Sequence, residues 1–370
     1  MLASPLTITG MGMVSGLGGA VEACAAARAG LVRAAPLDFA VRDSGSTDLV
    51  TVIGRTAGDL TQGFTEVGMA TRLTSLALAD LFRQTPVEDA ELHDMAVLLN
   101  LPSGYYLQQA DELTQRATRP ASTPADTLSS FEKTKPLYDS VIDKSFSAIG
   151  KIPPPRSRQR IFFGDQAGID LVLSEAHKLL ADGGVTACLV GGVDSLALSQ
   201  WTSACERLAI LRTPLRPVGL IPGEAGAFSI VELARRKETR KSLGSIVRCE
   251  FGLESCHRFS GSQPDGRMLS DVIRRCLAGN ADSSSLLTDI NGDSPRSTEL
   301  GQALVRLRPD IEFAETVVPA TSFGDTRAAS AFIGVSMALR AFHRGYASAP
   351  RFLVSAASDS GGRAALQISS

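Results

Sequence analysis

The strand-to-helix junction at residues 161–184, IFFGDQAGIDLVLSEAHKLLADGG, is the stretch best placed to do chemistry. Its first three residues predict a short strand that breaks at Gly164, and the rest predicts an amphipathic helix that stops at a pair of glycines. The first N–H groups of a helix stabilise an anion, so many α/β enzymes hold a nucleophile at such a turn. Here the turn carries Asp165 and Gln166, and neither side chain is a thiol or a hydroxyl.

Other chemical groups in the sequence give weaker signals. The six cysteines and four histidines show no metal-ligand spacing, so we expect no metal and small buried thiols in a reducing compartment. Cys256 and His257 are adjacent, and as neighbours on a strand they would point to opposite faces, which argues against a catalytic pair. Ser195 lacks the GxSxG context of a hydrolase. The early glycines do not complete a dinucleotide-binding GxGxxG, so we expect no cofactor.

The bulk composition excludes several classes of function. The 370 residues carry a net charge of −2, which gives no support for binding nucleic acid or an anionic membrane surface. No apolar run approaches the ~20 residues that span a bilayer. The first residues contain no Lys or Arg before their apolar run, which argues against a signal peptide. The expected compartment is therefore the cytoplasm.

Apolar strands and amphipathic helices alternate along the chain and would position these groups. Strands are expected at residues 6–10, 95–102 and 186–197, and in the second half within 245–255 and 351–366, with helices at 20–30, 68–83 and 265–279. Residues 103–158 change in composition and predict a surface excursion, cap or interface. Two successive series of strands and helices predict an α/β protein that is internally duplicated, with halves at 1–242 and 243–370.

Six segments, in order, resemble the β-ketoacyl synthases of the thiolase fold. They are ITGMGMVSGLG, SEAHKLLADGGVTACLVGGVDS, LRPVGLIPGEAGAF, NGDSPRSTE, SFGD and SDSGG. Together they cover most of the chain apart from about residues 30–65 and 103–157. The resemblance implies a thiolase fold, in which two duplicated βαβαβ-type halves form a five-layered αβαβα architecture.

The resemblance also implies where the family would hold its catalytic groups. Counting back from Gly183 places the family's nucleophilic Cys at Gln166, and its two His fall on Asn291 and Asp325. Its Lys falls on Ala320. The remaining pocket-lining candidates are Asp165, Asp293 and the final gate segment, Ser360, Gly361 and Gly362. All four chemical positions are thus substituted, and Gln166, Asn291, Ala320 and Asp325 are called the substituted positions below.

These substitutions predict that the chain is not an enzyme. The amide of Gln166 cannot be made nucleophilic near neutral pH. Asn291 could donate one neutral hydrogen bond to an enolate, but an ionised Asp325 would repel it unless burial raised its pKa. Losing a single oxyanion donor costs about 2.7–4 kcal/mol of barrier. We favour a hydrogen-bonded network that holds the loops over an unusual site with Asp325 as general base, and we expect Asp165 to cap the following helix.

Catalytically inactive relatives of two kinds supply the functional hypotheses. The DINGDSPRSTELG and PATSFGDTRAAS loops look like those of thiolase-like proteins that accompany type VI secretion effectors, which implies an adaptor or chaperone for an effector or its spike or PAAR partner. The alternative is a chain-length factor, a non-catalytic partner of an active ketosynthase and its acyl carrier protein. An unusual acyl-transfer or decarboxylating enzyme comes third.

The resemblance further implies two-fold pairing through the strand before the nucleophile position. We expect Arg160, Ile161, Phe162 and Phe163 to form this dimer strand, in a homodimer or a heterodimer.

Overall fold

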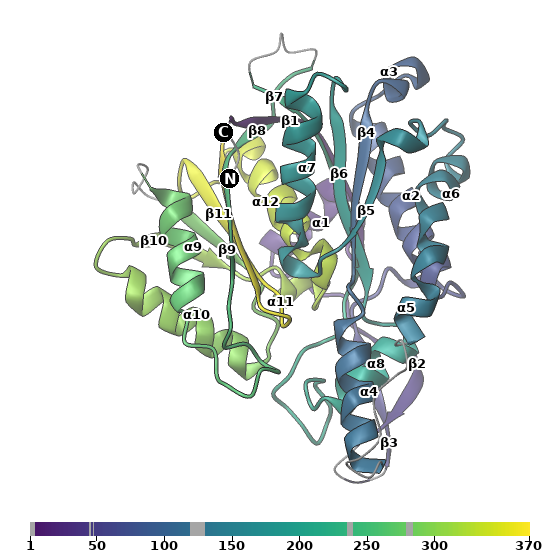
Figure 1. Ribbon diagram of the computed structural model, residues 1–370, viewed down its shortest axis with the longest axis vertical. Helices are drawn as coiled ribbons and strands as arrows, with labels where there is room; N and C mark the ends of the chain where they lie inside the picture. Colours follow the sequence, from purple (N-terminus) through teal and green to yellow (C-terminus); the bar gives the residue numbers. More distant parts are fainter. Residues whose placement is uncertain (1–3, 44–45, 47, 119–129, 235–239, 279–283) are drawn as a thin grey trace.

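A computed structural model describes residues 4–43, 46, 48–118, 130–234, 240–278 and 284–370. Ten strands form one mixed sheet, and a separate two-stranded ribbon projects from it (Figure 1). No helix among the described residues has both the length and the apolar character needed to cross a membrane.

The strands of the two halves of the chain are arranged in the same order. In the first half, β7 (Glu224–Leu233) lies antiparallel between β1 (Leu6–Ser15) and β6 (Cys188–Ser195), and β4 (Ala96–Leu101) and β5 (Gln159–Phe163) follow parallel to β6. In the second half, β12 (Gly362–Ser369) lies antiparallel between β8 (Gly244–Leu253) and β11 (Arg351–Ala357), followed by parallel β9 (Ser284–Thr288) and β10 (Phe313–Val317). This repeated order is the physical form of the duplication that the sequence predicted.

The two half-sheets meet through a short antiparallel contact. Leu6, Thr7 and Ile8 of β1 pair with Ile246, Ser245 and Gly244 of β8, which makes the ten strands continuous. The first repeat therefore ends with β7 and the second begins with β8. The division into two domains at residue 242 stays a prediction.

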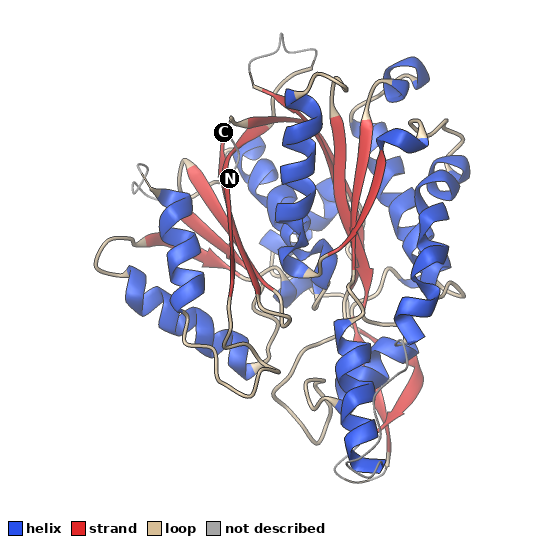
Figure 2. Cartoon of the chain, viewed as in Figure 1, coloured by secondary structure: helices blue, strands red, loops and turns tan. Residues whose placement is uncertain are grey.

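Helices cover both faces of each half-sheet, which gives five layers (Figure 2). The central layer consists of α7 (Ile169–Ala181) and α12 (Ser330–Arg344), which contact strands of both halves. On the outside, α2 (Glu66–Gln84) and α6 (Val141–Ala148) cover the first half-sheet, and α9 (Arg267–Leu277) and α10 (Ser294–Leu307) cover the second. The predicted α/β class and thiolase-type layering are confirmed.

Burial on both faces explains why the strands read as unbroken apolar runs. Every residue of β1, β4 and β6 is buried, as expected for strands that helices cover on both sides. The prediction ended the first strand at Gly10 in a glycine-rich turn, but β1 continues to Ser15. A Cβ atom on Gly12 would lie 2.2 Å from the backbone nitrogen of Leu81, so this glycine lets α2 rest directly on the strand.

The excursion at 103–158 contributes to the core as well as to the surface. It contains α4 (Tyr105–Thr118), α5 (Ser130–Thr134) and α6, with residues 119–129 outside the described part. Tyr106 and Phe146 are both at most 3% exposed. The shorter helices elsewhere are α1 (Ala20–Arg28), α3 (Asp89–His93), α8 (Ser199–Arg207) and α11 (Ala320–Phe323). The projecting ribbon consists of β2 (Ala35–Arg42) and β3 (Leu49–Gly54).

Candidate functional site

The turn between β5 and α7 is sharp and bends at Asp165. This residue has φ 47° and ψ −143°, and residues Gln166–Gly168 form a 3₁₀ turn before α7 begins at Ile169. A positive φ is costly for a residue with a side chain and is typical of strained functional turns. The bend of the turn is therefore one residue before Gln166, where counting had placed the nucleophile.

The side chain of Asp165 does not cap α7, so that prediction was wrong. Its Oδ1 accepts a hydrogen bond from the backbone N–H of Ser103 at 2.9 Å, and its Oδ2 accepts one from the Ser103 hydroxyl. Because the strained backbone turns the carboxylate toward the loop after β4, the carboxylate ties that loop to the turn and cannot reach the first N–H groups of α7.

The side chain of Asn100 holds the backbone of the same turn through hydrogen bonds. It is fully buried in β4, and its Nδ2 donates to the carbonyls of Asp165 at 2.7 Å and Ala328 at 3.0 Å. Its Oδ1 accepts from the N–H of Gly164 at 3.1 Å. One side chain thus joins β4, the turn and the segment before α12. The sequence analysis missed this residue, whose only signal was a lone amide within the apolar run DMAVLLNLP.

Gln166 and the gate segment lie together. Gln166 is 2% exposed, and its Nε2 has no hydrogen-bond partner among the described residues. The N–H of the next residue, Ala167, donates to the Ser358 hydroxyl at 3.0 Å, and a Cβ atom on Gly362 would lie 3.0 Å from the Cβ of Ala167. Gly361 is also buried, with φ +106°, whereas Ser360 is exposed.

The two positions where the family has His bond to each other. Asn291 Nδ2 donates to Asp325 Oδ2 at 2.6 Å, and both residues are at most 7% exposed. Asn291 Oδ1 accepts from the backbone N–H of Asp293 at 3.0 Å, and Asp325 Oδ1 accepts from that of Arg327 at 2.9 Å. The side chain of Asp293 pairs instead with Arg258. Both oxygens of Asp325, the oxygen of Asn291 and one of the two Asn291 N–H groups are therefore engaged with the protein.

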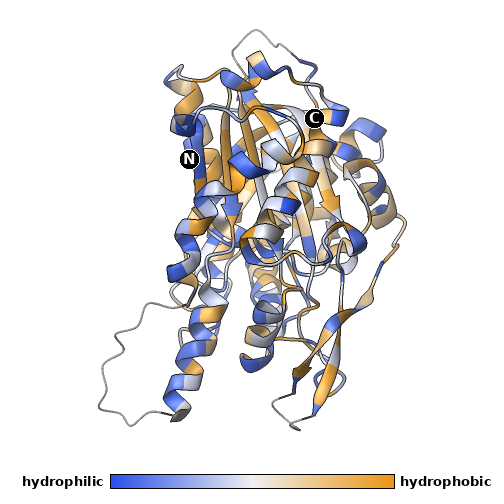
Figure 3. Cartoon of the chain, turned by 90° about the vertical axis from the view of Figure 1, so that its right-hand side faces the viewer, coloured by the Kyte–Doolittle hydropathy of each residue, from blue (hydrophilic) through white to orange (hydrophobic). Residues whose placement is uncertain are grey.

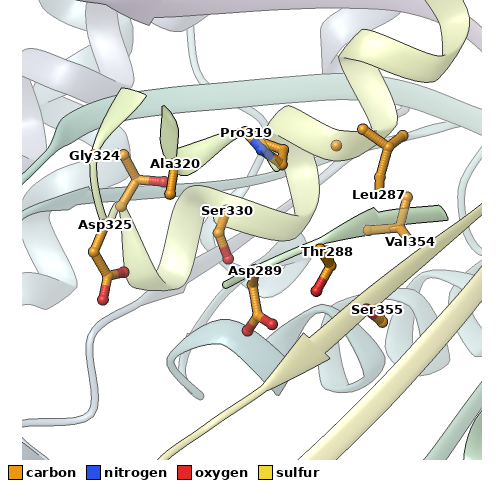
Figure 4. Close-up of a pocket in the computed structure, with 12 residues that line it drawn as sticks. Leu287, Thr288, Asp289, Pro319, Ala320, Gly324, Asp325, Ser330, Val354 and Ser355 are labelled. Atoms are coloured by element: carbon orange, nitrogen blue, oxygen red, sulfur yellow. The ribbon is translucent and has the colours of Figure 1, made fainter. Parts of the chain in front are cut away.

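Ala320 borders a cavity of only about 20 Å³, which is room for about one water molecule (Figure 4). Asp325, Asp289 and Ser330 line the same cavity. Arg55 Nη1 donates a hydrogen bond to the Ala320 carbonyl at 2.7 Å. An acyl chain does not fit in a space of this size.

Arg327 is a buried cation that follows Asp325 closely in the chain. Arg327 is 2% exposed, has φ +30°, and donates to both carboxylate oxygens of Asp194 at 3.0 and 2.9 Å. Its guanidinium lies 4.0 Å from the ring centroid of Trp201. Burial alone would lower the pKa of Arg327, but the charge and hydrogen bonds of Asp194, together with the charge of Asp165, outweigh burial and raise it. Sequence analysis did not identify Arg327 as a candidate residue.

A second buried polar chain reaches the gate. The Tyr106 hydroxyl donates a hydrogen bond to Asp359 Oδ2 at 2.5 Å. Arg296 Nη2 lies 3.3 Å from Asp359 Oδ1, and its Nη1 lies 3.0 Å from Asp289 Oδ2. Burial would raise the pKa of Asp359, but the positive charges of Arg296 and Arg258 and the hydrogen bond from Tyr106 together outweigh burial and lower the pKa. These contacts connect α4, α10 and the loop before β12.

Cys256 and His257 lie in a loop, because β8 ends at Leu253, so the strand geometry assumed for them was wrong. A Cβ atom on Gly361 would lie 3.4 Å from the His257 ring, and the Nδ1 of His257 is buried without a partner among the described residues. Cys256 is the one cysteine in the described chain that is not fully buried. No three His, Cys, Asp or Glu side chains in the described segments are close enough to hold a metal ion.

Solved structures of ketosynthases share this architecture. The ishigamide ketosynthase/chain length factor matches with a TM-score of 0.65 and 20% identity over 99% of both chains. An oxazolomycin ketosynthase domain from Streptomyces albus JA3453 matches with a TM-score of 0.71 and 15% identity, over 99% of this chain and 74% of that one. A type II polyketide ketosynthase, bound to the hexaketide and in complex with its acyl-carrier protein, gives 0.71 and 12% over 99% of both.

No protein-family model and no curated protein sequence matches the chain. At these identities the structural likenesses show the ketosynthase fold alone, and they lend no support to a link with type VI secretion.

Proposed function

We propose that this chain is a non-catalytic, ketosynthase-like subunit that pairs with an active ketosynthase, as a chain length factor does. The observation that carries the proposal is the match to a ketosynthase/chain length factor over 99% of both chains, in a chain whose β5–α7 turn has no thiol. The finding favours this alternative over the secretion adaptor that the loop sequences had suggested.

The geometry of the substituted positions supports the absence of chemistry. Gln166 offers only an amide, and one of the two Asn291 N–H groups donates to Asp325, whose carboxylate would repel an enolate. The cavity beside Ala320 holds about one water molecule and has no room for an acyl chain.

The exposed edge of β5 supports the mode of pairing. β5 ends the ten-stranded sheet, and all five of its residues are half-buried. Gly164 N–H donates to the Leu101 carbonyl of β4, so alternation along the strand directs the N–H of Ile161 to the open edge. On α7, which follows β5 in the chain, the apolar side chain of Leu171 is 47% exposed. An open strand edge is suited to strand addition by a second chain.

The proposal requires a ketosynthase gene beside the gene of this chain, and co-expression of the two proteins tests it. We expect the two to elute together in size-exclusion chromatography with one copy of each. Ile161→Pro removes the outward N–H and should abolish co-elution, whereas the matched Ile161→Ala variant shortens the same side chain, keeps the N–H and should still co-elute. Thermal unfolding of each variant alone verifies that it folds. Separate elution of the wild-type proteins, or co-elution with a spike or effector protein in place of a ketosynthase, would refute the proposal.

A further inference from the structure

A second hollow, far larger than the one beside Ala320, lies beneath the projecting ribbon. Its volume is about 390 Å³, within the range of sites for small molecules. β2 forms one side, the segment 56–65 and the start of α2 form the other, and the residues just before α8 close the end. In Figure 3 the ribbon projects from the body at the lower right and carries apolar segments, drawn in orange.

The walls of this hollow are apolar and partly exposed. Leu37 and Phe39 of β2 are half-buried, Met69 is 5% exposed, and Phe64 is 42% exposed. Leu37 can fold inward because Gly54 on β3 has no side chain, and a Cβ atom there would lie 2.6 Å from a Leu37 methyl. An aromatic ring exposed at the mouth of an apolar hollow is a typical wall for a bound ring or aliphatic chain.

Hydrogen bonds to one buried carboxylate hold the hollow open. Glu224 lines its floor at 2% exposure and accepts from the Ala57 N–H at 3.0 Å and the Ser195 hydroxyl at 2.9 Å. The Thr61 hydroxyl also donates to it. Arg72, outside the lining, supports the same segment by donating to the Leu60 carbonyl at 2.8 Å. The 57–61 segment and the end of β6 are thus fixed to one point, so the hollow exists before any ligand binds.

The ionisable residues that line the hollow are all acidic. Its ionisable lining residues are Asp38, Asp59 and Glu224, and its lining contains no Lys, Arg or His. The groups that donate hydrogen bonds to Glu224 are all neutral, and among the described residues Glu224 forms no ion pair. A buried carboxylate is normally paired with a cation, so the floor of the hollow favours a positive charge and disfavours a negative one.

We propose that this hollow binds a small amine with an apolar body. The body packs against Phe39, Phe64 and Met69, and the ammonium group faces the carboxylates of the rim and floor. The site is separate from the substituted positions, and it excludes free fatty acids and acyl phosphates because they would bring negative charge to an acidic floor. It assigns to the chain a small-molecule site that is independent of pairing with a ketosynthase.

Three probes that share one naphthyl body test the charge preference. Naphthylethylamine, naphthylethanol and naphthylacetate are titrated into the full-length protein by isothermal titration calorimetry at low ionic strength. We expect one site for the amine, with affinity at least tenfold tighter than for the alcohol, and no measurable binding of the acid. Added salt should weaken binding of the amine more than binding of the alcohol.

Matched variants locate the site. Phe64→Ala should weaken binding of the amine at least fivefold, while Leu60→Ala, which removes a side chain of equal exposure on the same segment but outside the lining, should leave it unchanged. Asp59→Asn should weaken the amine and not the alcohol. Because Asp59 is exposed, this variant tests the charge without the risk to folding that Glu224→Gln carries.

The proposal is overturned if the acid binds as tightly as the amine, if no probe binds, or if Phe64→Ala and Leu60→Ala have equal effects. Each result is independent of whether the chain pairs with a ketosynthase, since the titrations use this chain alone.

Discussion

Breaking the buried ion pair between Arg327 and Asp194 should destabilise the protein strongly. In Arg327→Met, Asp194 would remain buried at 3% exposure with only the Ala328 N–H, at 3.2 Å, as a donor. Leaving one partner of a buried pair without the other costs about 3–5 kcal/mol. Loss of the guanidinium from the face of Trp201 adds about 1–2 kcal/mol. We therefore expect the free energy of unfolding to fall by about 4 kcal/mol or more.

A double-mutant cycle separates the pair from its surroundings. Asp194→Leu alone should cost about 3–5 kcal/mol, because it leaves the guanidinium buried without a counter-charge. Combining it with Arg327→Met removes both charges, so the double variant should be more stable than either single variant, with a coupling of about 3 kcal/mol. The positive φ at Arg327 persists in all three chains and cancels in the cycle.

The assay is urea unfolding followed by fluorescence and by far-ultraviolet circular dichroism. Trp201 is the chain's single tryptophan and touches Arg327, so its fluorescence reports on this site directly. Arg116→Met, at an arginine whose side chain is 81% exposed, is the control and should not move the midpoint. A cost below about 1 kcal/mol for Arg327→Met, or additive single variants, would refute the reasoning.

Two further variants test the networks around the turn. Asn100→Ala removes three buried hydrogen bonds, while the Gly164 N–H keeps the Leu101 carbonyl and the Asp165 carbonyl keeps the Gly168 N–H as partners. At about 0.5–1.5 kcal/mol for each lost bond, it should lower the free energy of unfolding by about 2–4 kcal/mol, measured in urea. Arg296, with Arg258 and the Tyr106 hydroxyl, lowers the pKa of Asp359, so the ionised carboxylate stabilises the fold above the ordinary carboxyl pKa, and this contribution is lost as pH falls through the lowered pKa. Asp359→Asn should therefore flatten the acid limb of a plot of unfolding midpoint against pH, and superimposable limbs would show that Arg296 contributes nothing through this residue.

The positions of several helices and strands could be predicted because the spacing of apolar residues within a short window shows which residues are buried. The strand expected at 95–102 is observed at Ala96–Leu101, and the helix expected at 68–83 is observed at Glu66–Gln84. Both depend on the spacing of apolar residues within a short window. The five-layered architecture followed from the family resemblance, but the order of strands was not predicted, since period and composition alone do not specify topology.

The site was less predictable for two physical reasons. Counting back from Gly183 used the family's spacing and placed the nucleophile at Gln166, whereas the backbone bends at Asp165 and residues Gln166–Gly168 form a 3₁₀ turn, which no spacing in the sequence shows. The partners of buried polar groups are also remote in sequence, as Asp194 and Arg327 are separated by 133 positions. No local pattern in the chain links such residues, so only the folded structure brings them together.

Intact-protein mass spectrometry tests the central claim most directly. The chain is incubated alone with acyl and malonyl thioesters of an acyl carrier protein, beside an active ketosynthase as the positive control. We predict that its mass stays unchanged and that no malonyl thioester is decarboxylated, because the turn at Asp165 and Gln166 offers no nucleophile. An acyl adduct, above all on Cys256 beside the gate, or turnover of the malonyl thioester would contradict the account.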